Sequence, residues 1–318
     1  MLDYNVYEDI AGRSGGDIYV GVVGPVRTGK STLIKKFMTE LVIPNVEEGN
    51  DKAVMVDELP QSASGKSIMT TEPKFVPAKG CKVKIENATA NVRFADCVGF
   101  ITKGAHGFEE DGKPRLVNTP WSSEPLPFAE AAELGTEKVI SEHSTIGVCV
   151  TTDGSVSDIP RSGYIDAEER TVARLKALGK PFVIVLNCVD PEKAAARRLR
   201  DELENKYGVS VISANCEKID ANGLMNVLKA VLFEFPVTGF DIDIPDWTRF
   251  LPQDCSAISE LLERVKGAAS AVNKMKDCGV FDTMLSDCKF WKTEVSVALS
   301  LSDGKASVKA SVQDGIFY

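Results

Sequence analysis

Histidine is scarce in this chain of 318 residues, which has only two, and no C-x-x-C pair occurs among its eight cysteines. The common structural zinc sites need cysteine or histidine ligands at short, repeated spacings, so the sequence excludes them. Cys149 and Cys188 lie in apolar runs that are typical of buried strands. We therefore expect the cysteines to be buried thiols in a reducing compartment rather than disulfides or metal ligands.

Basic charge and long apolar runs are also limited. The net charge is −9 and the only basic cluster is Arg197–Arg200, which argues against a nucleic-acid partner held through phosphate contacts. No apolar run reaches transmembrane length, and the acidic N-terminus lacks the pattern of a signal peptide. The sequence thus predicts a cytoplasmic protein without a transmembrane segment.

The chain does contain the motif G-x-x-x-x-G-K-[ST], from Gly24 to Ser31, directly after the apolar run Ile18–Val23. In such a loop successive backbone N–H groups wrap nucleotide phosphates, and the following helix points its positive end at them. Lys30 is expected to reach the β- and γ-phosphates, and the Ser31 hydroxyl to ligate Mg²⁺. Arg27 adds positive charge near the phosphates or else lies at the surface. The predicted nucleotide-binding residues of the motif are Gly24, Arg27, Thr28, Gly29, Lys30, Ser31 and Thr32.

A carboxylate is predicted to face this motif from the end of a neighbouring strand. Asp96 and Gly99 follow the run Asn91–Ala95, and there an aspartate can hold Mg²⁺ through water while a glycine amide senses the γ-phosphate. Thr70 and Thr71 lie where nucleotide switches place a threonine that completes the Mg²⁺ coordination; either could serve, or they could simply start a strand. The predicted catalytic residues are therefore Lys30, Thr70, Thr71 and Asp96, and the predicted metal ligands are Ser31, Thr70, Thr71 and Asp96.

The base-recognition motif of guanine-specific proteins of this class is N-K-x-D, but this chain has N-C-V-D from Asn187 to Asp190. Cys188 replaces the lysine whose stem would lie against the base, so the sequence leaves the choice between ATP and GTP open. Asp190 could still bond guanine, or it could cap the next helix, because Pro191 suits the first helical position. The predicted nucleotide-binding residues here are Gly99, Asn187, Asp190, Ser213 and Ala214, the last two from a loop that resembles the S-A-x loop of a base pocket.

From Phe128 onward, helical and strand patterns alternate. Residues 1–239 are predicted to form an α/β P-loop NTPase domain of Ras-like or translation-factor type, with a mostly parallel sheet covered by helices on both faces. Two alternating runs, Lys82–Glu86 and Asn91–Ala95, predict a β-hairpin. The segment Gly99–Pro127 has no clear periodicity and is expected to be a mobile loop.

The alternation ends near residue 240. Residues 240–318 are predicted to begin an α+β middle domain, with a linker at Asp241–Asp246, a helix from its cap Asp254 to Lys276, and a hairpin over Thr293–Val312. One helical region and one hairpin cannot close a core alone, so we expect this domain to be truncated or packed on the first.

Several of these segments closely resemble the stage IV sporulation protein A family, the morphogenetic ATPases of the spore coat in endospore-forming bacteria. The resemblance spans essentially the whole chain and is carried by Gly16–Thr32, Thr70–Pro73, Asp96–Gly99, Val183–Asn187 and Gly304–Ala306. That family looks like a translation-factor-type GTPase that turned to ATP, which agrees with the missing lysine of N-K-x-D.

The resemblance implies ATP and Mg²⁺ as cofactors, Lys30 as the Walker A lysine, Asp96 as the Walker B-like carboxylate, and Thr70 or Thr71 as the sensor threonine. Members of the family use ATP hydrolysis to assemble into a homopolymer, a basement layer around the forespore in the mother-cell cytoplasm. They dock through a short amphipathic membrane-bound peptide and recruit other spore coat proteins.

Two other functions remain open. The first is a GTPase of the ribosome-assembly or RNA-modification type. The second is a scaffold that holds nucleotide without catalysis, because Phe100 stands where many GTPases have a water-orienting glutamine. If the chain is an ATPase, the same phenylalanine predicts slow hydrolysis.

Overall fold

The computed structural model describes residues 6–14, 17–46, 50–60, 73–85, 88–103, 108–110, 113–252 and 254–313. The chain forms two compact units, Met1–Val231 and Leu232–Tyr318. Within the described ranges, none of the helices is both long and apolar enough to cross a membrane.

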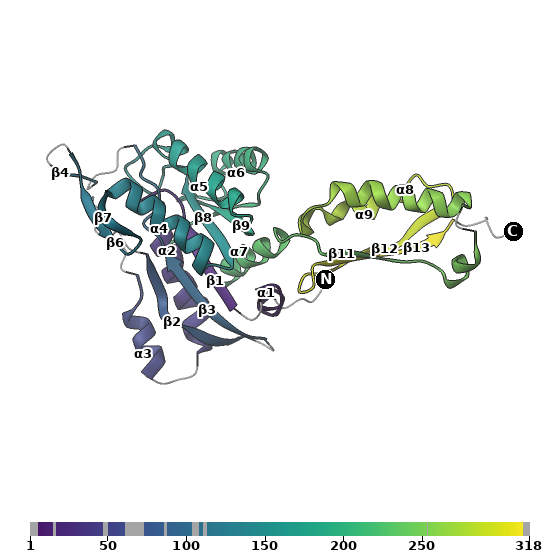
Figure 1. Ribbon diagram of the computed structural model, residues 1–318, viewed down its shortest axis with the longest axis horizontal. Helices are drawn as coiled ribbons and strands as arrows, with labels where there is room; N and C mark the ends of the chain where they lie inside the picture. The colour runs from purple at the N-terminus through teal and green to yellow at the C-terminus, as the bar shows by residue number, and fades with distance from the viewer. Residues whose placement is uncertain are drawn as a thin grey trace. The chain divides into compact units, whose positions relative to one another are not determined.

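A six-stranded sheet in the order β10-β9-β8-β1-β3-β2 forms the centre of the first unit (Figure 1). Neighbouring strands are parallel except β2, which runs antiparallel to β3. Every residue of β8 and β9 is buried, as expected for parallel strands covered on both faces. The predicted α/β fold with a mostly parallel sheet is therefore confirmed. The strands are β1 (Asp17–Val23), β2 (Lys74–Ile85), β3 (Ala88–Asp96), β8 (Ile146–Thr152), β9 (Phe182–Asn187) and β10 (Val211–Ala214).

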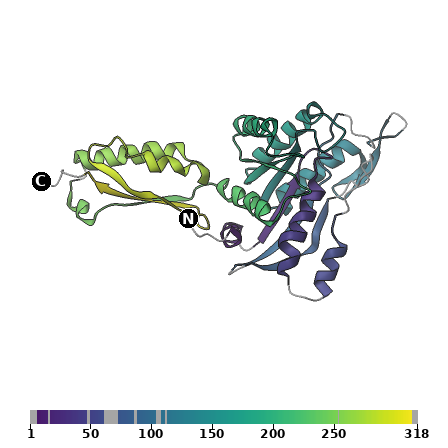
Figure 2. The same ribbon diagram turned by 180° about the vertical axis from the view of Figure 1, so that it is seen from behind.

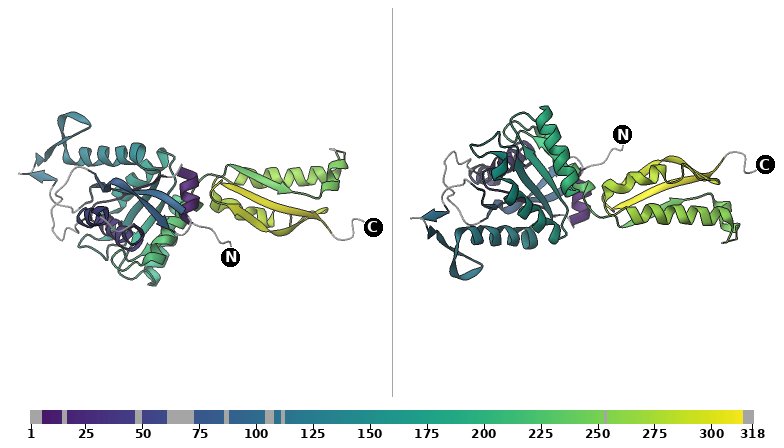
Figure 3. Two further views of the ribbon diagram at one scale, coloured as in Figure 1. Left: turned by 90° about the horizontal axis from the view of Figure 1, so that it is seen from below. Right: turned by 90° about the horizontal axis from the view of Figure 1, so that it is seen from above.

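Helices cover both faces of this sheet. α4 (Phe128–His143), α5 (Ile165–Ala177) and α6 (Ala194–Tyr207) pack on one face through a shared apolar core. α2 (Lys30–Phe37) and α7 (Ala221–Phe233) lie in front of the other face in Figure 2. The views in Figure 3 likewise place α2 and α4 on opposite sides of the strands. This layering leaves the carboxyl ends of the parallel strands at one edge, where ligands of such sheets bind.

The segment between β3 and α4 differs from its prediction. It contains two short hairpins, β4 (Glu109–Glu110) with β5 (Lys113–Pro114) and β6 (Leu116–Thr119) with β7 (Ser122–Pro127). The expectation of a mobile loop over Gly99–Pro127 is therefore wrong for this part. Most of the described side chains in these strands are exposed or half-buried, so no apolar alternation marks them.

Two more helices complete the first unit, α1 (Val6–Ser14) and α3 (Asn50–Asp57). α2 continues as a π-helical turn, Met38–Val42, and a 3₁₀ turn, Ile43–Asn45. The buried residues Leu33, Ile34 and Phe37 of α2 recur at helical spacing, and Pro44 lies in the turn that ends this helical region. The sequence analysis did not predict α3.

A mixed three-stranded sheet in the order β11-β13-β12 forms the second unit with α8 (Ser256–Ala271) and α9 (Val280–Thr283). β12 (Trp291–Ser300) and β13 (Lys305–Val312) form the predicted hairpin. The linker prediction is wrong, because β11 (Gly239–Asp243) pairs with β13 in parallel. The helix prediction was too long and its cap was misplaced, since α8 ends at Ala271 and its N-cap is Cys255.

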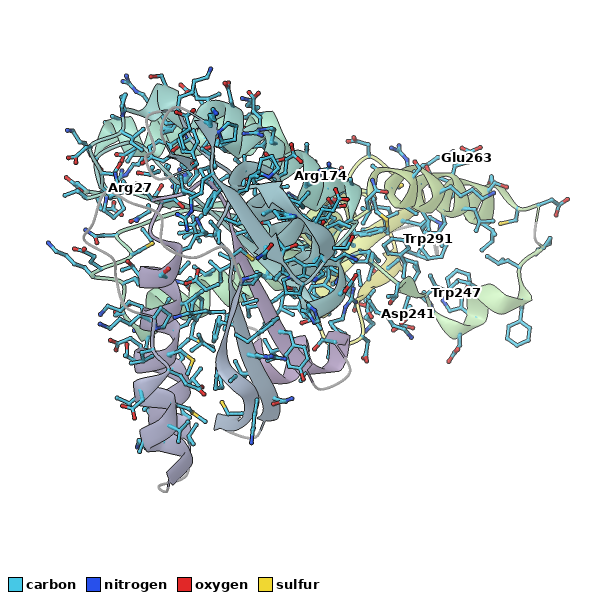
Figure 4. All side chains as sticks on the ribbon, turned by 60° about the vertical axis from the view of Figure 1, so that its left-hand side comes forward. Arg27, Arg174, Asp241, Trp247, Glu263 and Trp291 are labelled. Carbon is cyan, nitrogen blue, oxygen red and sulfur yellow. The ribbon has the colours of Figure 1, made fainter. Side chains whose placement is uncertain are left out.

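Trp291 lies at the centre of the second unit, between α8 and the sheet (Figure 4). It is fully buried, and its Nε1 donates a hydrogen bond to the carbonyl oxygen of Ala257 at 2.7 Å. Burying an indole N–H with a partner avoids the cost of an unpaired donor. Alternate residues of β13 complete this core, namely Ala306, Val308 and Ala310.

Candidate nucleotide site

The glycine-containing loop between β1 and α2 starts at the carboxyl end of β1, between β3 and β8. Three of its residues have positive φ: Gly24 at 136°, Arg27 at 64° and Gly29 at 94°. A Cβ atom on Gly24 would lie 2.2 Å from a carbonyl oxygen of β8, and one on Gly29 would lie 2.4 Å from Asn187 Nδ2. Both glycines are thus required for the loop, hereafter the Gly24–Ser31 loop, to close against its neighbours.

Lys30 begins α2 and is 6 % exposed. Its Nζ donates to the carbonyl oxygens of Pro25 at 2.7 Å and Gly24 at 3.3 Å. Because an ammonium has three donors, one is left for an anion beside the loop. Burial lowers the pKa of Lys30 to about 8, against the charge of Asp96, which raises it. A bound anion would restore the charged form, so the site favours negative ligands.

Asp96 closes β3 next to the same loop. Its Oδ2 accepts a hydrogen bond from Ser31 Oγ at 2.6 Å. Burial raises the pKa of Asp96, while the Ser31 hydrogen bond and the charges of Lys30 and Lys74 lower it. A hydroxyl and a carboxylate at this distance are the oxygen ligands that Mg²⁺ prefers. Among the described residues no group of three His, Cys, Asp or Glu could hold a metal ion, so Mg²⁺ here would need further oxygens from a nucleotide or water.

The segment after Asp96 runs along the Gly24–Ser31 loop. The Phe100 N–H donates to the carbonyl oxygen of Gly24 at 3.3 Å, and the Val26 N–H donates to that of Phe100 at 2.9 Å. Gly99 has a φ of 93°, and its Cβ atom would lie 2.0 Å from the Gly24 oxygen. The Phe100 side chain is 3 % exposed and is covered by the Arg170 guanidinium, 5.5 Å from the ring centre. A phenylalanine side chain has no polar group, and this one is buried as well, so Phe100 cannot orient a water molecule for hydrolysis.

Asn187 ends β9 and connects two loops. Its Nδ2 donates to the carbonyl oxygen of Thr28 at 2.9 Å, and its Oδ1 accepts the N–H of Cys216 at 3.0 Å. Both ends of the amide are thus used to hold the Gly24–Ser31 loop against the loop after β10. Asn187 thus lies beside the Gly24–Ser31 loop, and in this structure its amide contacts protein backbone.

Cys188 and Asp190 differ in their exposure to solvent. Cys188 is fully buried, and burial raises the pKa of its thiol to about 11. Asp190 is exposed, and its Oδ1 accepts the Glu192 N–H at 3.2 Å. The interpretation of Asp190 as a helix cap is wrong, because α6 starts at Ala194 with Lys193 as its N-cap.

Val189 reveals residues that the sequence prediction missed. Its N–H donates to Ser155 Oγ at 3.0 Å, and its carbonyl oxygen accepts Asn215 Nδ2 at 3.0 Å. Asp153 Oδ1 in turn accepts both the N–H and the hydroxyl of Ser155, at 2.9 and 2.6 Å. The available signal was Asp-Gly-Ser directly after an apolar strand, which is typical of a turn at a strand end.

The remaining predicted residues have mixed outcomes. Thr70 and Thr71 lie outside the described residues. Thr32 is half-buried on α2, and Ala214 O accepts the Cys188 N–H. The Oγ of Ser213 is buried without a hydrogen-bond partner in the described part of the chain.

Arg27, labelled in Figure 4, is half-buried on the Gly24–Ser31 loop. The charge of Arg27 affects the pKa of Tyr164. Burial raises the pKa of Tyr164, while its hydrogen bond with Ser157 and the charge of Arg27 lower it. The charge of Arg27 therefore acts on Tyr164, the residue before α5.

Comparison with known proteins gives matches along the whole chain. Residues 1–236 match the family described as "Stage IV sporulation protein A, ATPase domain", and residues 237–318 match "Stage IV sporulation protein A, middle domain". The chain is 43 % identical over 318 residues to stage IV sporulation protein A of Bacillus subtilis (strain 168). It is 45 % identical over the same length to that of Clostridioides difficile (strain 630). These alignments cover all of this chain and 65 % of each relative.

Proposed function

Because this chain belongs to the stage IV sporulation protein A family and carries its ATPase domain, we propose that the Gly24–Ser31 loop is a Walker A loop that binds ATP with Mg²⁺ for slow hydrolysis. The contact between Ser31 Oγ and Asp96 Oδ2, at 2.6 Å, carries this proposal. It unites the hydroxyl of the loop and the carboxylate of a neighbouring strand beside the buried Lys30 ammonium.

Each residue has a defined task under this proposal. The N–H groups of the loop and the free donor of Lys30 bind the β- and γ-phosphates. Ser31 and Asp96 hold Mg²⁺, which when bound neutralises charge on the phosphates. Gly99 offers its N–H to the γ-phosphate. We propose Thr70 or Thr71 as a further ligand that senses the γ-phosphate.

ATP is proposed over GTP because Cys188 is too short and too buried to cover a base as a lysine stem would. One observation supports GTP as the alternative, since Asp190 keeps an exposed carboxylate that could accept the N–H donors of guanine. Competition between the two nucleotides for the same site separates these proposals. Displacement of bound ATP by a lower concentration of GTP would favour the alternative.

The test of the site is a binding and phosphate-release assay on three variants. Lys30→Ala removes the positive charge that would bind the phosphates, so it should abolish binding. Asp96→Asn should bind ATP but hydrolyse it poorly, and chelation of Mg²⁺ should reproduce that loss. Lys35→Ala is the control, because Lys35 is an exposed lysine of the same helix. Wild-type affinity in Lys30→Ala would refute the phosphate-binding role of the loop.

On the scale of the cell, we propose that ATP hydrolysis drives self-assembly into the basement layer of the spore coat. The setting is the mother-cell cytoplasm at the outer forespore surface, with a short amphipathic membrane-bound peptide and other coat proteins as partners and no nucleic acid. Membership of a sporulation family supports this role. Sedimentation with ATP, compared with a non-hydrolysable analogue, tests the dependence of assembly on hydrolysis.

A further inference from the structure

Val189 is held by side chains from two loops although it lies at the surface. The residue is 55 % exposed, yet Ser155 accepts its N–H and Asn215 donates to its carbonyl oxygen. An exposed backbone group can bond to water at little cost, so these contacts are not needed to satisfy it. Their effect is to fix the position of the short segment Val189–Asp190.

The loop that carries Ser155 is itself anchored by a buried ion pair. Arg161 binds both carboxylate oxygens of Glu168, at 2.5 and 2.8 Å, and Glu168 is fully buried. Tyr207 donates its hydroxyl to the same carboxylate at 2.9 Å, and Arg161 also donates to the carbonyl oxygen of Thr152 at 3.3 Å. A buried pair with these additional partners has little freedom to move.

The turn between the anchor and Ser155 is equally restricted. Gly154 has a φ of 89°, and a Cβ atom there would lie 2.7 Å from the backbone nitrogen of Arg161. Its N–H donates to Thr152 Oγ1 at 3.0 Å. The turn that carries Ser155 therefore has little freedom to move, and it holds the Ser155 hydroxyl beside the Val189 N–H.

From this chain of contacts we infer that Ser155, held by Asp153, is a positioning residue for the nucleoside half of the site. It fixes the segment Val189–Asp190 beside the base and adds affinity for the base, not for the phosphates. The phosphate half is built separately, because Lys30 and Ser31 take their partners from the Gly24–Ser31 loop and Asp96. The inference rests on the proposed nucleotide site.

The test compares a ligand that has a base with one that lacks it. Calorimetry on the whole chain, with Mg²⁺, measures the Kd of ATP and of inorganic tripolyphosphate. Ser155→Ala removes one hydrogen bond, so we expect the Kd of ATP to rise about five-fold. The Kd of tripolyphosphate should stay within about two-fold. Ser155→Thr keeps the hydroxyl and should restore ATP binding.

The control is Ser157→Ala, in the same loop. The Ser157 hydroxyl bonds to that of Tyr164 at 2.5 Å and accepts the Ile159 N–H, so its removal should leave both affinities unchanged. Asp153→Ala is a second, independent variant and should act like Ser155→Ala. Thermal unfolding without ligand checks that each variant is folded.

The outcomes separate the inference from the proposed function on which it rests. An unchanged Kd of ATP in Ser155→Ala would overturn the inference, and so would an equal loss for ATP and tripolyphosphate. An effect of Ser157→Ala as large as that of Ser155→Ala would also overturn it. Failure of the wild-type chain to bind tripolyphosphate or ATP would instead refute the nucleotide site itself.

Discussion

Gly99→Ala is the substitution for which the structure gives the clearest expectation. The new Cβ atom would lie 2.0 Å from the Gly24 carbonyl oxygen and 2.7 Å from Lys30 Nζ, at a φ of 93°. The backbone strain costs about 1–3 kcal/mol. Rotation of a side chain cannot relieve a clash with a carbonyl oxygen, so the segment must leave the Gly24–Ser31 loop. It then loses the two hydrogen bonds of Phe100, worth about 1 kcal/mol each.

The strain and the clash destabilise the paired segment, while the lost hydrogen bonds oppose displacement in the wild type and the variant alike. The strain alone therefore shifts the equilibrium toward the displaced segment by a factor of about 5 to 150. Phosphate release should fall by a similar factor, because the Gly99 N–H no longer reaches the γ-phosphate. The Kd of ATP should change by less than about ten-fold, because Lys30 and Ser31 are untouched. Steady-state phosphate release and calorimetry measure the two effects.

Gly179→Ala is the matched control for this experiment. Gly179 also has a positive φ, 66°, but nothing lies within 4 Å of its Cβ position. The control thus carries backbone strain without a clash and should hydrolyse ATP at the wild-type rate. If Gly99→Ala kept wild-type hydrolysis, or if Gly179→Ala lost as much, the close approach of Gly99 would have no part in catalysis.

Three further outcomes are expected. ATP at 100 times its Kd should stabilise the chain against thermal unfolding by about 2.7 kcal/mol, and GTP at equal concentration by less; greater protection by GTP would reverse the base assignment. Glu168→Gln should lower the free energy of unfolding of the first unit in urea by about 3 kcal/mol, because Arg161 keeps a largely buried charge; a change below about 1 kcal/mol would show that water replaces the carboxylate. Since burial lowers the pKa of Lys30 to about 8, the free lysine is charged at pH 7 and mostly neutral at pH 9, so the Kd of ATP should rise about ten-fold between them. A flat profile, or one that Lys35→Ala changes, would contradict the last expectation.

The sheet and the position of the Gly24–Ser31 loop beside Asp96 could be predicted because their signals are local. The strand patterns predicted beyond Phe128 include β9, which is apolar from Phe182 to Leu186 and buried throughout, as expected for a parallel strand covered on both faces. The Gly24–Ser31 loop is likewise encoded within eight consecutive residues, because its function depends on backbone geometry. The position of Asp96 was predicted because it comes directly after the strand pattern Asn91–Ala95.

The elements that were missed depend on contacts between distant segments. β11 has only five residues and becomes a strand because β13 lies beside it, and the linker prediction could not see that partner. Asp190 next to Pro191 has the local pattern of a helix start. Instead, the backbone N–H of Lys193 donates to the carbonyl oxygen of Asp190 in a turn, and the helix begins only after it, at Ala194.

The two halves of the site therefore constrain sequence change differently. A substitution in the Gly24–Ser31 loop alters the backbone that we propose wraps the phosphates, and Gly24 and Gly29 have no substitute without strain. The position of Val189–Asp190 is instead set from outside, by Ser155 and Asn215. Under the proposed function, a cysteine at position 188 gives the base no lysine stem to lie against, while the segment that carries Asp190 keeps its position. A site built this way can change its preferred base while its phosphate chemistry stays intact.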